Sequence, residues 1–265
     1  MSQKLEATLH VQKYVTAVFE QRLRQAGFSC LDDNMLCWYR LRNDEVLDTV
    51  IFCTKRKVVP VEINIYYEAS PLFTRPVNIT DVYFPVNDLT RHDCAHRRQI
   101  LEDQNINGAN LCLFSPEIHV IAPGHGQRGM HMLTDVVLPY FDRIQTVFDC
   151  YAAHKANHLC TPSWCTEPPV NRFFNMSMEF MDEALYVDDR EVYPFFAACI
   201  RRKMKVISDK LFITPNSQEY LRAQQHAQWL EFAVADGGRE TYLEIMIDRE
   251  RKNRQYFKSI WQHKQ

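Results

Sequence analysis

Glycine is scarce in this chain. Only 7 of its 265 residues are glycine, against a usual share of roughly 7%. This scarcity excludes collagen-like, low-complexity and glycine–serine linker chains, because those need far more flexible backbone. An excess of charge of one sign is also missing, since the formal net charge is -2. A nucleic-acid-binding domain usually has a basic face and a pI above about 9, so nucleic acid is not an expected partner.

Long apolar runs are missing too. No stretch approaches the ~18 consecutive apolar residues of a membrane span, so no membrane partner is expected. The first twenty residues mix charged and apolar side chains instead of forming the apolar core of a signal peptide. We therefore expect a soluble, cytoplasmic protein. Its nine cysteines are an odd number and are expected to be reduced thiols in that compartment.

The remaining composition, with 46% hydrophobic and 24% charged residues, is typical of a globular protein. It is not that of a disordered chain. Apolar residues recur at helical spacing over residues 3–26, and Gly27 is a natural helix stop. The period then changes to two in three segments joined by short polar turns. This change predicts an antiparallel meander of strands over residues 36–41, 46–53 and 59–65.

Sequence patterns in the later part of the chain predict mainly helices. A helical pattern over residues 133–148 contains Pro139, which is expected to kink it or to begin a second helix. A proline-rich segment at 158–170 is the expected linker. Beyond it, helical patterns cover residues 173–185, 193–211, 218–235 and 239–261, with Gly237 and Gly238 between the last two.

These patterns predict an α+β fold in two parts. Residues 1–160 are expected to form an N-terminal helix and an antiparallel sheet with flanking helices. Residues 170–265 are expected to form a mainly α-helical C-terminal domain or subdomain.

The most unusual local sequence matches the pattern G-x-G-x-x-G. It follows an apolar strand pattern and precedes a helix, an arrangement that can aim backbone N–H groups at a phosphate. Two features argue against a dinucleotide site. Pro123 lies at the entry of the motif, and no strand follows that would deliver an acidic residue to hold a ribose. Two alternatives stay open: an anion-binding loop, or a surface loop whose glycines only permit unusual backbone angles. The candidate ligand-binding residues are Gly124, His125, Gly126, Arg128 and Gly129.

A second cluster combines thiol and imidazole side chains. Cys150, His154 and His158 are spaced by four, so a continuous helix places them on one face. Together with Cys160 and Cys165 they are candidate zinc ligands. The four residues between the last two cysteines differ from the tight pairs of zinc ribbons. The alternative is a buried Cys150 with polar histidines near a helix C-terminus, so no cofactor is expected and zinc stays the alternative.

The N-terminal part has a recognisable order. A helix pattern ends in Gln25-Ala26-Gly27-Phe28, Trp38-Tyr39-Arg40 follows on a strand, and alternating strands and a late apolar helix complete it. Over roughly residues 1–156 this order resembles a family of bacterial α+β domains of unknown function found among candidate toxin-immunity proteins. The resemblance implies stoichiometric binding of a protein rather than turnover, and it carries over no site residues.

Two functions therefore follow. The first is an intracellular, immunity-like binding or interaction protein without evident catalysis, which predicts a groove or an exposed apolar patch. The second is an anionic-ligand-binding protein or enzyme that uses the Gly124–Gly129 loop. No catalytic residue is assigned, and the sequence leaves the oligomeric state open.

Overall fold

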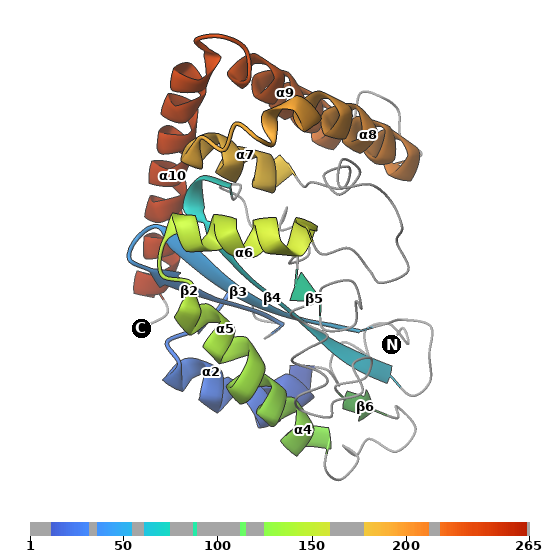
Figure 1. The fold of residues 1–265 in the computed structure, drawn as a ribbon. Helices are drawn as coiled ribbons and strands as arrows, with labels where there is room; N and C mark the ends of the chain where they lie inside the picture. Colours follow the sequence, from blue (N-terminus) through green and yellow to red (C-terminus); the bar gives the residue numbers. More distant parts are fainter. Residues whose placement is uncertain are drawn as a thin grey trace.

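The computed structural model describes residues 12–31, 36–54, 61–74, 87–88, 112–114, 125–159, 178–211 and 218–263. Within these ranges, helices cover both faces of an antiparallel sheet, and further helices form the C-terminal part (Figure 1). The predicted α+β class is confirmed. No helix among the described residues has the length and apolar character needed to cross a membrane.

The first helix ends where its glycine predicts. A π-helical turn η1 (Thr16–Glu20) continues into α2 (Gln21–Gln25). Gly27 has φ +83, a left-handed conformation that glycine adopts without steric cost. The Gly27 N–H donates to the Arg24 carbonyl and the Phe28 N–H donates to the Leu23 carbonyl, both at 2.9 Å. This is a Schellman cap, and it turns the chain into β1 (Ser29–Cys30).

The predicted meander forms the centre of the sheet. Strands β2 (Cys37–Arg42), β3 (Val46–Thr54) and β4 (Val61–Pro71) pair antiparallel in chain order. The third strand is longer than the sequence pattern predicts, because its pairing with β3 continues to Pro71 opposite Val46. The short strands β5 (Asn87–Asp88) and β6 (Cys112–Phe114) pair with β4, and β1 pairs with β2.

The helical pattern over residues 133–148 is not one helix. Helix α4 (His125–Met132), the π-helical turn η4 (Leu133–Val137) and α5 (Leu138–Arg143) are continuous. Pro139 is the second residue of α5, directly after the π-helical turn, and it has no N–H to donate. The break comes at Ile144, which is extended with φ -102 and ψ 102.

Helix α6 (Val147–Leu159) starts after this break with a capping box, in which the hydroxyl of the N-cap residue Thr146 accepts a hydrogen bond from the Asp149 N–H at 3.2 Å. The Asp149 carboxylate accepts hydrogen bonds from the backbone N–H groups of Gln145 (2.9 Å) and Thr146 (2.8 Å). These bonds lower the pKa of Asp149. Phe148 is 63% exposed, so it does not continue the helical face on which Phe141 is buried.

The C-terminal part consists of α7 (Met178–Val187), α8 (Tyr193–Leu211), α9 (Gln218–Ala233) and α10 (Gly238–His263). Helix α10 runs from these helices down to the sheet (Figure 1). At the sheet end, the Asn253 amide donates to the Leu72 carbonyl at 2.6 Å, in the short helical turn η2 (Leu72–Thr74). Nearby, the Phe257 ring packs against the Tyr39 ring, with 5.4 Å between the ring centroids. One long helix therefore joins the two parts of the chain.

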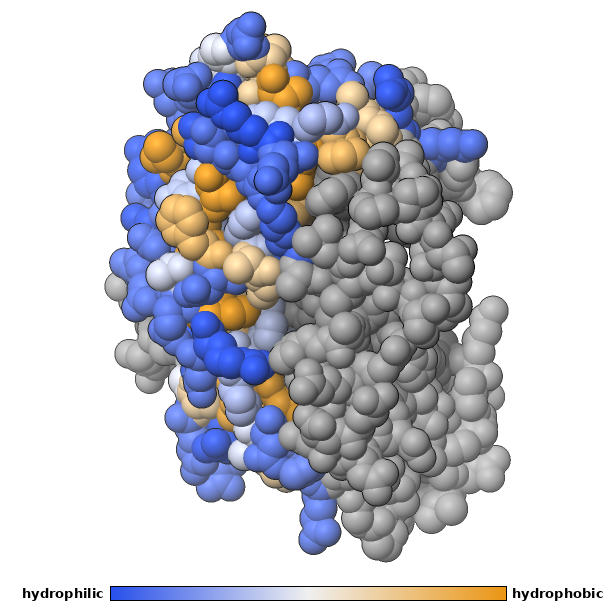
Figure 2. Space-filling model, in the orientation of Figure 1, coloured by the Kyte–Doolittle hydropathy of each residue, from blue (hydrophilic) through white to orange (hydrophobic). Residues whose placement is uncertain are grey.

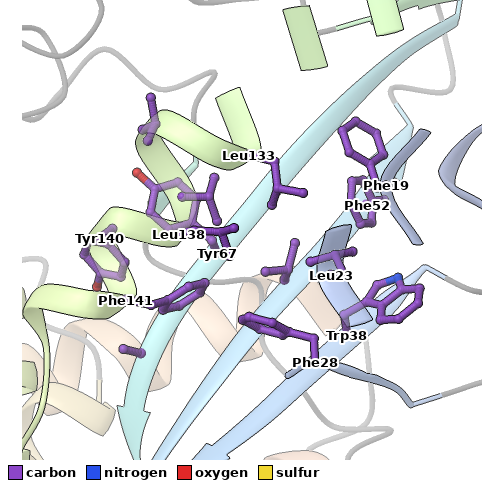
Figure 3. Packing of buried hydrophobic residues seen from close by; sticks show 14 of the residues in the cluster. Phe19, Leu23, Phe28, Trp38, Phe52, Tyr67, Leu133, Leu138, Tyr140 and Phe141 are labelled. Atoms are coloured by element: carbon purple, nitrogen blue, oxygen red, sulfur yellow. The ribbon is translucent and has the colours of Figure 1, made fainter. Parts of the chain in front are cut away.

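Adjacent residues of β2 face opposite cores. Trp38 lies in a cluster between one face of the sheet and the helices η1, α2, η4 and α5, with Phe19, Phe52 and Phe141 (Figure 3). Tyr39 lies on the other face with Leu47, Leu72 and Phe257. A third cluster fills the space among α6 and the C-terminal helices. The alternation read from the sequence thus separates two buried faces.

The short connection between α9 and α10 contains two glycines whose substitution should affect stability differently. A Cβ added to Gly238 would lie 2.0 Å from the Phe232 carbonyl oxygen. We expect Gly238→Ala to lower the free energy of unfolding by about 1–3 kcal/mol, because the backbone must shift. Gly237, with φ +76 and no atom within 4 Å of an added Cβ, provides the control. Asparagine tolerates this conformation, so Gly237→Asn should have a smaller effect in urea unfolding, and equal effects would contradict the prediction.

Candidate functional site

The glycine-rich motif lies at the start of a helix instead of in a loop. Gly124 lies outside the described residues, whereas His125, Gly126, Arg128 and Gly129 belong to α4. Gly129 is buried, which suits a residue without a side chain at a packed helix turn. The expected loop is therefore wrong from His125 onward, and anion binding by these residues stays a prediction.

The structure describes only some of the candidate zinc ligands. Cys150 and His154 are buried one turn apart on α6, and His158 also lies on α6. Cys160 and Cys165 lie outside the described residues. The described part of the chain contains no group of three or more histidine, cysteine, aspartate or glutamate side chains suited to hold a metal ion. Burial raises the pKa of the Cys150 thiol, which favours the neutral, buried form.

His154 has acidic partners instead. Its Nδ1 atom lies 2.7 Å and 2.9 Å from the two carboxylate oxygens of Glu183 on α7. Its Nε2 atom lies 3.8 Å from Oε1 of Glu68 on β4. Sequence reasoning missed both glutamates, because nothing in the local pattern around either residue indicates a partner on another element.

A second buried polar network holds α9 in place. Oδ1 of Asp182 on α7 accepts hydrogen bonds from the Tyr242 hydroxyl (2.6 Å) and from His226 Nε2 (2.9 Å). Its Oδ2 accepts from Arg249 Nη1 at 2.8 Å. Asp182 is fully buried, and each donor comes from α9 or α10. Arg249 also donates to the Phe73 carbonyl (2.9 Å) in η2, so the network links three helices to the end of the sheet.

The inward face of α9 carries mostly small side chains. Ala223, Ala227, Leu230 and Ala233 are buried, and alanine allows neighbouring helices to approach closely. With His226 bonded to Asp182, this face fixes the rotation of the helix about its axis. The opposite face is consequently held toward solvent.

That outward face carries large apolar side chains. Leu221, Trp229 and Phe232 are 48%, 36% and 43% exposed, and we call these three residues the α9 row. The rings of Trp229 and Phe232 pack edge to face, with 5.6 Å between their centroids. Leu221 and Phe232 are three turns apart, about 16 Å along the helix. Apolar residues interrupt the hydrophilic surface over the upper helices in Figure 2.

The sequence did not single out this row. Both faces of α9 contain apolar residues, and an amphipathic reading favours burial of tryptophan and phenylalanine over alanine. Tertiary packing instead buries the alanine face against α7, α8 and α10. The row is thus a surface that becomes visible only once the helices are assembled.

No protein-family model, no curated protein and no solved structure matches this chain.

Proposed function

We propose that this chain is a cytoplasmic protein that binds another protein stoichiometrically, without catalysis, through the α9 row. The observation that carries the proposal is the exposure of Leu221, Trp229 and Phe232 on one helix face. Large exposed apolar side chains that gather on one face mark interaction sites. Tryptophan is also enriched among residues that dominate binding energy.

Two further features support this role. The helix is anchored from behind by the bond between His226 and the buried Asp182, and a rigid helix face loses little entropy when a partner binds. The resemblance of the N-terminal part to bacterial toxin-immunity domains implies the same stoichiometric mode of binding.

The test uses the full chain and a double variant, Leu221→Glu with Phe232→Glu. The chain is used to capture proteins from the cells that produce it, and each captured protein is then purified and titrated by calorimetry. We expect the double variant to weaken binding by about 30-fold or more, because each substitution places a charge where apolar contact is needed.

Phe148→Glu provides the matched control, because Phe148 is exposed on a different helix, α6. It should leave affinity unchanged, and circular dichroism checks that every variant is folded. The proposal fails if no captured protein binds the purified chain, or if the double variant binds as tightly as the wild type.

A further inference from the structure

Four exposed side chains form a regular line along the outward face of α9. Leu221, Gln225, Gln228 and Phe232 are all exposed, and they follow one another at intervals of four, three and four residues. This spacing places them on one side of a helix. It is also the spacing of the a and d positions of a coiled coil. We call these four residues the α9 stripe, and its pattern is that of a surface which packs against another helix.

The α9 stripe keeps its pattern when the helix is reversed end for end. Its midpoint falls between residues 226 and 227, so Leu221 and Phe232 lie at equal distances from it, as do Gln225 and Gln228. A two-fold axis at this midpoint brings two copies of α9 together antiparallel. Leu221 of each copy then lies opposite Phe232 of the other, and Gln225 lies opposite Gln228. Apolar side chains meet apolar ones, and amides meet amides.

The two glutamines suit such a pairing. A side-chain amide both donates and accepts hydrogen bonds, so Gln225 of one copy and Gln228 of the other can bond each other. The two-fold symmetry repeats this pair on the other side of the axis. A polar residue at a core position of a coiled coil fixes the register at a cost in stability. The amides therefore favour the antiparallel register over a slipped one.

Charge does not oppose the meeting of two copies. Among the side chains that the structure describes on α9, Glu231 is the exposed one with a formal charge. The two Glu231 residues of an antiparallel pair lie about 14 Å apart along the helix axes, beyond the Debye length of about 8 Å at physiological ionic strength. Trp229, beside the stripe and 36% exposed, adds apolar surface. A nearly uncharged, self-complementary face fits a second copy of itself.

The position of α9 in the fold leaves this face outward. Helix α9 lies with α8 at the end of the molecule away from the sheet (Figure 1). The bond between His226 and the buried Asp182 holds its inward face, so the stripe is presented as a preformed surface. A two-fold contact uses the same patch on both copies and closes on itself, so the pairing ends at a dimer.

We propose that a second copy of this chain covers the α9 stripe when the other protein is absent, through an antiparallel, two-fold pairing of the α9 helices. The inference rests on the proposed function, because the α9 row is part of the same surface. It adds a form of regulation: a protein that binds the α9 row must displace the second copy. A contact confined to one helix pair belongs to the small, transient interfaces that bury less than about 1,200 Å².

Sedimentation velocity of the full chain under reducing conditions measures the self-association. We expect a monomer–dimer equilibrium with a Kd of about 10–100 µM. Leu221→Lys and Phe232→Glu, each tested alone, should weaken it about tenfold or more, because each places a charge against an apolar side chain at both ends of the dimer. Phe148→Glu, on α6, is the control and should dimerise as the wild type. Circular dichroism checks that each variant is folded.

Mixing the two single variants tests the antiparallel register. In a mixed dimer the introduced lysine lies opposite the introduced glutamate, while the contact between Leu221 and Phe232 at the other end stays intact. We expect the equimolar mixture of Leu221→Lys and Phe232→Glu to dimerise about fivefold more tightly than either variant alone. A parallel pairing keeps the two introduced charges at opposite ends of the dimer and gives no such recovery.

A chain that remains monomeric at concentrations about tenfold above the expected Kd would overturn the proposal. A dimer that neither single variant weakens, or a mixture that shows no recovery, would overturn it as well. The capture experiment keeps this outcome separate from the proposed function. If the chain is monomeric but the captured protein still loses affinity for the double variant, the proposed function stands and only the self-pairing is rejected.

Discussion

Asp48→Asn is expected to lower the free energy of unfolding by about 3–5 kcal/mol, the range found when one partner of a buried ion pair is removed. Asp48 is fully buried on β3, opposite Arg40 on β2. Its carboxylate accepts hydrogen bonds from Arg40 Nε (2.9 Å) and Arg42 Nη2 (2.7 Å). The two largely buried guanidinium groups have no other carboxylate of comparable burial among their described ion-pair partners.

The cost is large because these arginines also close two helix ends. Arg40 Nη1 donates to the Ala26 carbonyl at 2.9 Å, and its guanidinium lies 4.8 Å from the centre of the Phe28 ring. Arg42 Nη1 donates to the Phe141 carbonyl at 2.7 Å. Asp48 thereby fixes the side chains that join α2 and α5 to the sheet. Its loss leaves two positive charges in an apolar core.

Urea unfolding followed by circular dichroism measures this effect. Asp44→Asn is the matched control, because Asp44 is an exposed aspartate that pairs with Lys258. An exposed ion pair contributes about 0–1 kcal/mol. Similar midpoints for the two variants would show that the buried carboxylate is not needed.

Asp182→Asn is expected to lower the free energy of unfolding by about 3 kcal/mol. The substitution removes the charge that faces Arg249 and weakens the hydrogen bonds from His226 and Tyr242. These donors lie on α9 and α10, so the loss should loosen the packing of both helices on α7.

The pH dependence gives a second measure of the same network. Burial raises the pKa of Asp182, but the charges of His226 and Arg249 and the bonds from His226 and Tyr242 together hold it below its ordinary value. A carboxyl with a lowered pKa in the fold contributes stability above its unfolded-state pKa of about 3.9. That contribution is lost as pH falls through the folded-state pKa.

Urea unfolding of the wild type and of Asp182→Asn between pH 3 and pH 7 tests this prediction. The stability difference between them should shrink as pH falls. Asp248→Asn is the control, since the Asp248 carboxylate is exposed and pairs with Arg251 and Lys252 on its own helix. A difference independent of pH would contradict the predicted role of the Asp182 charge.

Sequence patterns located most of the helices and the central strands. Gly27 predicted the end of the first helix because a left-handed cap requires little more than one flexible residue. Pro139 predicted the position of the helix break less well. It lies at the start of α5, but the helix ends five residues later at Ile144, and Thr146 with Asp149 then caps the next helix. Periodicity alone cannot detect a break that a side-chain cap creates.

The sites were harder to predict. Spacing by four placed Cys150 and His154 on one helix face, yet the bonded partner of His154 is Glu183, 29 residues away. Asp182 and Tyr242 are 60 residues apart and share a hydrogen bond of 2.6 Å. Such pairs depend on which helices pack together, and short-range spacing carries no information about that.

The sequence by itself determined the fold class and most of the local segments, because propensity, alternation and helix stops act over a few residues. Tertiary structure alone decided which face of α9 is buried, so that alanines lie inside and Trp229 and Phe232 outside. It also decided that His154 lies between two carboxylates. The physical reason is the same in both cases: burial and pairing are settled by the shape and chemistry of neighbours that are distant in the chain.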